Sequence, residues 1–187
     1  MLPLKASKFN RYQEYDTLTL AKELLGKILV SVQDGTVTAG RIIETEAYLH
    51  NDPACHAFMN KKTKRNAAMF MSAGNSYVYL IYGMHYCFNV VSGQEGVGEA
   101  VLIRALEPLY GIEIMQKRRN TTKIEQLCSG PSKLCQAMGI DMSHNMLSLC
   151  SDKLYILDAE VQNRNIISTT RIGITKGTEL PYRFLLY

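Results

Sequence analysis

The chain has 187 residues, of which 47% are hydrophobic and 20% charged, and its formal net charge is +4. This composition can bury a sizeable core and predicts a single domain over residues 1–187. The mildly basic charge permits a nucleic-acid partner but does not require one. The sequence has no apolar run long enough to cross a membrane and no apolar secretory segment near Met1. We therefore expect no membrane partner, and a cytoplasmic, nucleoid-associated location if the source is bacterial.

The five cysteines are odd in number, and no pair has the spacing C-x-x-C. A disulfide framework and a zinc ribbon are both disfavoured by this pattern, which is typical of a protein from a reducing compartment.

The first part of the chain predicts a helix followed mainly by strands. We expect a helix from Asp16 or Thr17 to about Leu25, strands over Lys27–Gln33 and Val37–Leu49, a polar loop over His50–Asn66, and strands over Met69–Tyr82, Met84–Ser92 and Glu99–Ala105. The later elements are helices over Leu109–Arg119 and from Ser129 to Gly139, and strands near Leu154–Leu157, Arg171–Thr175 and Tyr182–Tyr187. Strands dominate and helices do not alternate with them. This order predicts an α+β fold: a mostly antiparallel sheet with surrounding helices and a protruding hairpin.

The aromatic block Tyr77–Asn89 reads as strand, turn and strand around Gly83. This interpretation places Tyr82, Met84 and His85 near an exposed tip, where large apolar side chains are costly unless they bind something. A protein that extrudes a base from a duplex needs such a wedge. The alternative is that the tyrosines of the block form ordinary cross-strand pairs in the sheet core.

Two carboxylates, Glu44 and Glu46, lie two residues apart on a predicted strand, so their side chains share one face with Tyr48. One interpretation is a solvated strand face with charge pairs. The other is a carboxylate that activates water beside an aromatic wall.

A metal site is not expected. His56 is near His50, Asp52 and Glu46 in the sequence, but the spacing matches no known ligand motif, and a structural or hydrogen-bonding histidine is favoured. The glycine-rich run Gly93–Gly98 lacks the lysine of a P-loop and precedes Glu99, whose charge opposes phosphate, so we reject a nucleotide site there.

Basic residues form two groups, Lys61–Arg65 and Lys117–Arg119 with Lys123. With the predicted helix start at Ser129–Lys133 they are candidates for phosphate contacts, and an ordinary solvated surface is the alternative.

Five segments together resemble one family. They are Arg41–Tyr48, Asn66–Met71, Tyr77–Asn89, Leu102–Pro108 and Cys128–Ala137, the last reading CSGPSKLCQA. They resemble the alkyladenine (3-methyladenine) DNA glycosylases of the mammalian type, and the resemblance extends from about Leu18 to Tyr187. It implies a monofunctional enzyme without a cofactor that cuts the N-glycosidic bond of damaged purines in double-stranded DNA. A monomer is expected.

The resemblance also implies residue roles. Glu46 resembles the general base, Arg104 a residue that holds the attacking water, Tyr48, His56 and Tyr79 the walls of the base pocket, and Asn89 the residue that disfavours the amine of normal guanine. Tyr82 resembles the side chain that fills the gap left by the flipped nucleotide, with Met84 and His85 beside it in the minor groove. Among the basic residues, Arg65 and Lys133 are the weaker candidates for phosphate binding. The strand motifs contain no lysine, so a Schiff-base lyase step is not expected.

Three departures from the mammalian pattern stand out. The spacing from Tyr48 to His56 is one residue shorter, the loop after Asn89 is about two residues longer, and the position of His85 is usually aromatic. Two rival functions are a non-catalytic duplex-binding protein and a hydrolase of RNA or free nucleosides. The wedge argues against a nucleoside enzyme, because a free nucleoside needs no extrusion.

Overall fold

The computed structural model describes residues 6–159 and 164–187. Within these residues, eight strands form one antiparallel sheet in the order β3–β4–β5–β2–β1–β6, and β8 pairs with β2 and β7. The strands are β1 (Ile28–Gln33), β2 (Thr36–Tyr48), β3 (Ser76–Ile81), β4 (His85–Val91), β5 (Ala100–Tyr110), β6 (Leu154–Leu157), β7 (Ile166–Thr169) and β8 (Arg183–Leu186). The α-helices are α1 (Thr17–Glu23), α2 (Ile112–Arg119) and α3 (Pro131–Met138). The predicted α+β class with a mostly antiparallel sheet is confirmed.

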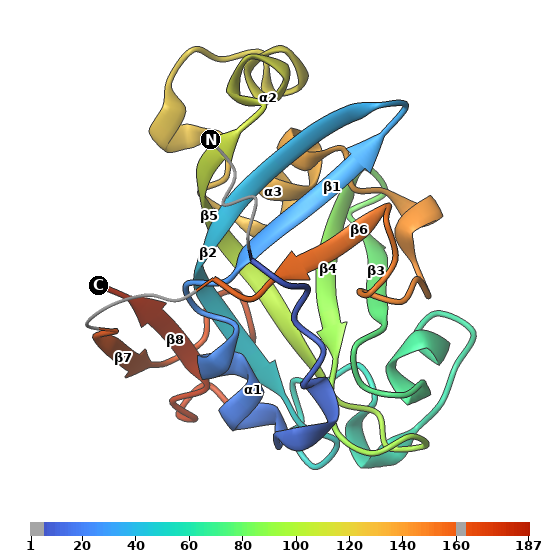
Figure 1. The fold of residues 1–187 in the computed structure, drawn as a ribbon. Coiled ribbons are helices and arrows are strands. Elements are labelled where there is room, and N and C mark those ends of the chain that lie inside the picture. Colours follow the sequence, from blue (N-terminus) through green and yellow to red (C-terminus); the bar gives the residue numbers. More distant parts are fainter. Residues whose placement is uncertain (1–5, 160–163) are drawn as a thin grey trace.

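Strand β2 organises the sheet, because it pairs with β5 on one side and with two successive strands on the other (Figure 1). Its first half pairs with β1, and Glu44–Glu46 pair with β8. The register of β2 with β5 shifts between Ile42 and Thr45, at the point where β2 changes partner. Such shifts bend a strand and re-aim its side chains. The two carboxylates of β2 therefore lie where three strands meet.

The main core lies between the sheet and the helices α1 and α3. Leu20 of α1, Phe88 of β4, Ile103 of β5 and Leu134 of α3 are all fully buried in it. Of the two predicted starts of α1, Asp16 is the cap, and it accepts a hydrogen bond from the backbone N–H of Thr19 at 2.8 Å. This core supports the strands that carry the candidate site.

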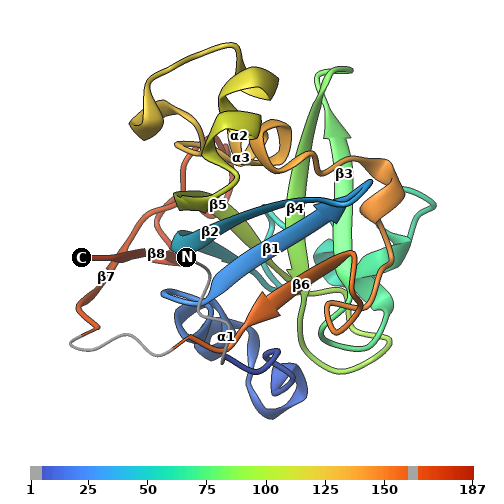
Figure 2. The same cartoon turned by 45° about the horizontal axis from the view of Figure 1, so that its top comes forward.

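The predicted hairpin is confirmed. Strands β3 and β4 pair from Ser76 with Val90 to Ile81 with His85, and Figure 2 shows their connection projecting past the rest of the sheet. Both Tyr82 (φ 53°) and Gly83 (φ 72°) have left-handed backbones, which glycine adopts freely and tyrosine rarely. Tyr82 is 84% exposed and Met84 is 71% exposed.

Several predicted boundaries and one predicted element are wrong. The strand predicted from Met69 begins at Ser76, because residues Ala67–Phe70 form a 3₁₀ turn ahead of the left-handed Gly74. The helix predicted from Leu109 begins at Ile112, because β5 continues to Tyr110 and pairs with β2 as far as Ala39.

The strand predicted over residues 171–175 is a loop. Its alternating isoleucines imitate a strand, but the backbone N–H of Ile172 donates to the Glu46 side chain instead of to a neighbouring strand. The strand of this region is β7, which ends at Thr169. Among the residues that the structure describes, no helix is long and apolar enough to cross a bilayer.

Candidate active site

A cavity of about 650 Å³ opens beside the β3–β4 hairpin. Its walls come from β2, β3, β4, β5, the loop after β2, the start of α3 and the loop over residues 172–176. Seven residues singled out from the sequence line it: Tyr48, His56, Tyr79, Tyr82, His85, Asn89 and Arg104. Its volume is within the range of small-molecule sites in proteins. The whole cavity lining extends from Tyr48 to Lys176, so the fold brings together residues that are far apart in the sequence.

Glu46 lies behind the cavity wall with 0% of its surface exposed. Its Oε2 accepts hydrogen bonds from the Tyr48 hydroxyl at 2.8 Å and from Arg104 Nη1 at 3.2 Å. Its Oε1 accepts one from the backbone N–H of Ile172 at 2.9 Å. A buried carboxylate requires such partners, because an unpaired buried charge is very costly. The interpretation of this strand face as solvated is therefore wrong, although charge pairs are present on it.

Arg104 lies between the two glutamates of β2. Its Nε donates to Glu44 Oε1 at 3.0 Å, and Arg183 Nε donates to the same oxygen at 2.6 Å. Burial alone would lower the pKa of Arg104, but the charges of Glu46 and Glu44 outweigh it and raise that pKa. Arg104 therefore stays cationic next to Glu46.

Aromatic rings form one side of the cavity. The ring centroid of Tyr79 lies 4.6 Å from that of His56 and 5.3 Å from that of Tyr77. His56 Nδ1 is 2.9 Å from the Tyr77 hydroxyl oxygen. Although part of His56 is open to solvent, its surroundings desolvate the imidazole and, with the charge of Arg65, lower its pKa. Burial raises the pKa of Tyr48, Tyr77 and Tyr79. These walls are consequently uncharged near neutral pH.

Asn89 lies at the back of the cavity and is 4% exposed. Its Nδ2 donates to the backbone carbonyl of Tyr77 at 3.0 Å, which fixes the orientation of the amide. The structure therefore holds the Asn89 side chain rigidly beside the tyrosine wall.

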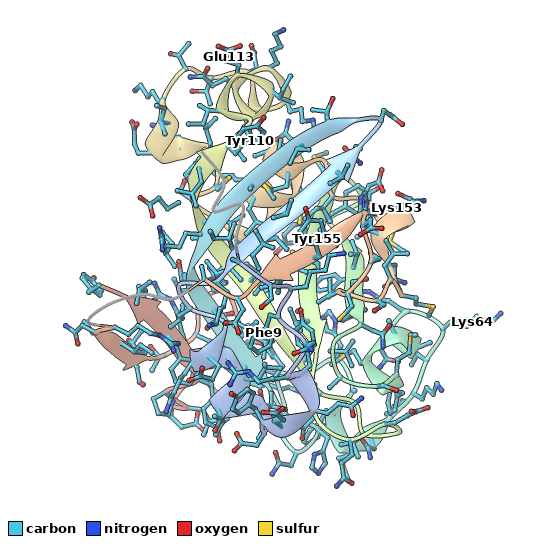
Figure 3. The ribbon with its side chains drawn as sticks, in the orientation of Figure 1. Phe9, Lys64, Tyr110, Glu113, Lys153 and Tyr155 are labelled. Carbon is cyan, nitrogen blue, oxygen red and sulfur yellow. The ribbon has the colours of Figure 1, made fainter. Side chains whose placement is uncertain are left out.

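The two phosphate candidates flank the cavity. Arg65 lies with its guanidinium carbon 5.3 Å from the Tyr79 ring centroid, and its Nη2 donates to the Leu80 carbonyl at 3.3 Å. Lys133 is exposed, and it directly follows Pro131 and Ser132, which line the cavity. Lys64, in the same basic segment as Arg65, extends away from the molecule (Figure 3). Arg65 and Lys133 thus place two positive charges beside the cavity.

The residues considered for a metal do not converge. His50 bonds to Glu99 at 2.6 Å, Asp52 to Arg171, and Glu46 to Arg104. No group of three or more His, Cys, Asp or Glu side chains in residues 6–159 and 164–187 is placed to hold a metal ion.

The family model for methylpurine-DNA glycosylase matches residues 10–187. The chain belongs to the methylpurine-DNA glycosylase family. Three curated relatives all bear the name "Putative 3-methyladenine DNA glycosylase". That of Francisella tularensis subsp. tularensis is 51% identical over 174 residues, covering 91% of this chain and 90% of the relative. That of Methanoculleus marisnigri is 53% identical over 179 residues (94% and 92%), and that of Carboxydothermus hydrogenoformans is 53% identical over 173 residues (91% and 90%).

Membership of the methylpurine-DNA glycosylase family makes this chain a DNA glycosylase of DNA repair and agrees with the resemblance drawn from its motifs. The fold of this chain also brings to the cavity a loop for which no site role is predicted from the sequence. Residues 172–176 form one wall, and the preceding Arg171 is buried, with Nη2 donating to Asp52 Oδ1 at 2.9 Å and Nη1 to the Ala47 carbonyl at 3.0 Å. No local sequence pattern predicts the pairing of Arg171 with Asp52, because the two residues are so far apart in the sequence. The only sign of this pairing in the sequence is Asp52 itself, a carboxylate close to His50 and His56 that is weighed as a metal ligand.

Proposed function

We propose that this glycosylase hydrolyses the N-glycosidic bond of alkylated or deaminated purines that are flipped out of duplex DNA. The observation that carries the proposal is the buried Glu46 carboxylate, held by three donors directly behind an aromatic cavity. The names of the relatives, which specify 3-methyladenine, support the same substrate class.

Glu46 acts as the general base in this proposal. Each carboxylate oxygen has two lone pairs, and Oε2 already accepts two hydrogen bonds whereas Oε1 accepts one. Oε1 is therefore the atom that accepts the proton of the attacking water, while Arg104 orients that water. The water oxygen bonds to C1′ of the sugar as the bond from C1′ to the purine nitrogen breaks, and the bonding electrons leave with the purine. The negative charge of Glu46 also stabilises the oxocarbenium-like sugar.

The aromatic walls bind the flipped base by stacking. Tyr48, His56 and Tyr79 present uncharged rings, which attract a cationic alkylated purine through its charge as well as its surface. A cationic base is already a good leaving group and needs little acid catalysis. Asn89 disfavours the exocyclic amine of normal guanine, because its amide is fixed beside the base. The pocket therefore attracts an alkylated purine through its positive charge and disfavours normal guanine through its exocyclic amine.

The hairpin tip holds the duplex open. Flipping a nucleotide costs a few kcal/mol, and least at damaged or mispaired bases. Tyr82 fills the vacated space, and Met84 and His85 lie beside it in the minor groove. Arg65, beside the Tyr79 ring, and Lys133, next to Ser132 of the cavity wall, contact the phosphates.

The test is base release from duplex oligonucleotides that carry one hypoxanthine or one ethenoadenine, and from methylated genomic DNA. The wild type should release the bases, and Glu46→Gln should abolish release while keeping DNA binding. Glu107→Gln, which removes a carboxylate from the exposed Arg41–Glu107 pair, is the matched control and should release bases like the wild type. A folded wild type that binds these duplexes but releases no base would replace the proposal with a non-catalytic duplex binder. Equal release from single strands or nucleosides would contradict the flipping role.

We also propose that the enzyme is monofunctional. Lys176 is the one lysine among the described residues that line the cavity, and it is exposed, whereas nucleophilic lysines are activated by desolvation. Borohydride added during the reaction should therefore trap no covalent complex with DNA. A trapped complex that disappears in Lys176→Ala would overturn this part of the proposal.

A further inference from the structure

A second carboxylate, Glu44, is part of the ion network but has no part in the mechanism above. Its Oε1 accepts from Arg104 Nε at 3.0 Å and from Arg183 Nε at 2.6 Å. Its side chain is 17% exposed. Glu44 therefore lies between two guanidinium groups, one from β5 and one from β8.

The bond to Glu44 determines how Arg104 is held. Nε of Arg104 is bound by Glu44 and Nη1 by Glu46, and two bonds to different carboxylates fix the plane of a guanidinium group. Within the described part of the chain, Nη2 has no protein partner and is left for water or substrate at the cavity that Arg104 lines. With Glu44 neutralised, Arg104 would be held only by Glu46, the group that is needed for the reaction.

Glu44 also offsets part of the positive charge that surrounds Glu46. Three arginines face Glu46 from other elements. Arg104 faces it from β5, Arg171 faces it from the loop beyond β7, and Arg183 is its paired residue on β8. The other titratable groups beside Glu46 are Tyr48 and Glu44 on β2 itself. Three cations thus surround Glu46, and Glu44 offsets two of them through its ion pairs. Without Glu44, the positive charge around Glu46 would lose the one carboxylate that balances it.

We propose that Glu44 is a positioning residue for base excision, which orients Arg104 and balances the positive charge around Glu46. This inference rests on the proposed function, in which Glu46 activates the water. Glu44 touches neither the water nor the substrate and acts only through Arg104 and the local charge.

The test is the single-turnover rate of hypoxanthine release under saturating enzyme, measured as a profile from about pH 5 to about pH 9. In Glu44→Gln the plateau rate should fall about tenfold, because misorientation of Arg104 by even a fraction of an ångström is costly. Its acid limb should move to lower pH by roughly half a pH unit or more, because a negative neighbour is lost. DNA affinity should stay unchanged.

Two further variants separate charge from geometry. Glu44→Asp keeps the charge but shortens the side chain, so the rate should fall while the acid limb stays in place. Arg183→Gln removes a cation near Glu46, so the acid limb should move to higher pH. Glu107→Gln removes a carboxylate that is paired with Arg41 across the same two strands and should change neither quantity.

The opposite shifts of the acid limb are the decisive readout, because a merely structural role would not produce them. If Glu44→Gln does not fold, the Arg183→Gln and Glu44→Asp profiles decide. If the wild type releases the base but the pH profiles of these variants are not shifted, the inference about Glu44 is overturned and the proposed function stands. Absence of release by wild type overturns the proposed function and this inference with it.

Discussion

The guanidinium carbon of Arg171 lies 4.7 Å from the ring centroid of Tyr48. The same guanidinium group makes a two-pronged pair with Asp52, and both side chains are almost completely buried. One buried cation therefore ties the wall of the cavity to the loop after β2 and to the loop whose Ile172 bonds to Glu46. The shape of the site depends on the Arg171–Asp52 pair, although neither of these two residues lines the cavity.

Asp52→Asn should destabilise the fold strongly. It leaves the buried Arg171 without its counter-charge, which costs about 3–5 kcal/mol in the free energy of unfolding. Urea denaturation measures this loss. Asp152→Asn, at the exposed pair with Lys8, is the control and should leave the unfolding midpoint unchanged. The double variant Asp52→Asn, Arg171→Met should lose less than the two single losses together, and strict additivity would argue against the pairing.

Tyr82→Asn should affect stability and activity in opposite directions. Asparagine tolerates the left-handed backbone of position 82 better than tyrosine, so stability should stay equal or rise by up to about 1 kcal/mol. Base release from duplex DNA should fall roughly tenfold, because the flipped state loses the side chain that stabilises it. Thermal unfolding and single-turnover assays measure the two effects. Asp34→Asn, at the left-handed position of the β1–β2 turn, should change neither. Unchanged base release by Tyr82→Asn would refute the wedge.

The thiols should differ sharply in their reactivity. All five cysteines are unpaired, and only Cys150 is exposed. Burial raises the pKa of Cys55 and of Cys128 to about 12, so neither has an appreciable thiolate population near pH 8. Iodoacetamide should therefore modify the native protein first at Cys150, and all five sites after unfolding, as read by mass spectrometry. Rapid labelling of Cys55 in the native state would show that the cavity opens further than the structure indicates.

His56 should make stability depend on pH on the acid side. Its folded pKa is lowered from the ordinary value of 6.5, mainly by desolvation, so the unfolded chain binds a proton more readily. The contribution is complete above about pH 6.5 and is lost as the pH falls through the folded pKa. His56→Asn should flatten this part of the stability profile. An imidazole titration by NMR that gave an ordinary or raised pKa for His56 would contradict the prediction.

Local sequence patterns determined much of this fold. Asp16 ahead of an apolar helical pattern predicted the cap of α1, and the glycine in the block Tyr77–Asn89 predicted the hairpin and its exposed tip. The spacing of Glu44 and Glu46 placed both on one face of β2, as their shared bonds to Arg104 show. These features depend on capping, turn chemistry and a two-residue period, all of which operate between neighbours in the chain.

The tertiary structure alone decided how the site is completed. The Ile172–Ile174 alternation indicated a strand, but Glu46 takes the backbone N–H that a strand would have used. The pairing of Arg171 with Asp52 and the bond between Arg183 and Glu44 join residues more than a hundred positions apart. Such contacts exist because the carboxylates of Glu44 on β2 and of Asp52 in the following loop need donors from whatever element the fold brings near them, and no local pattern in the sequence encodes which element that is.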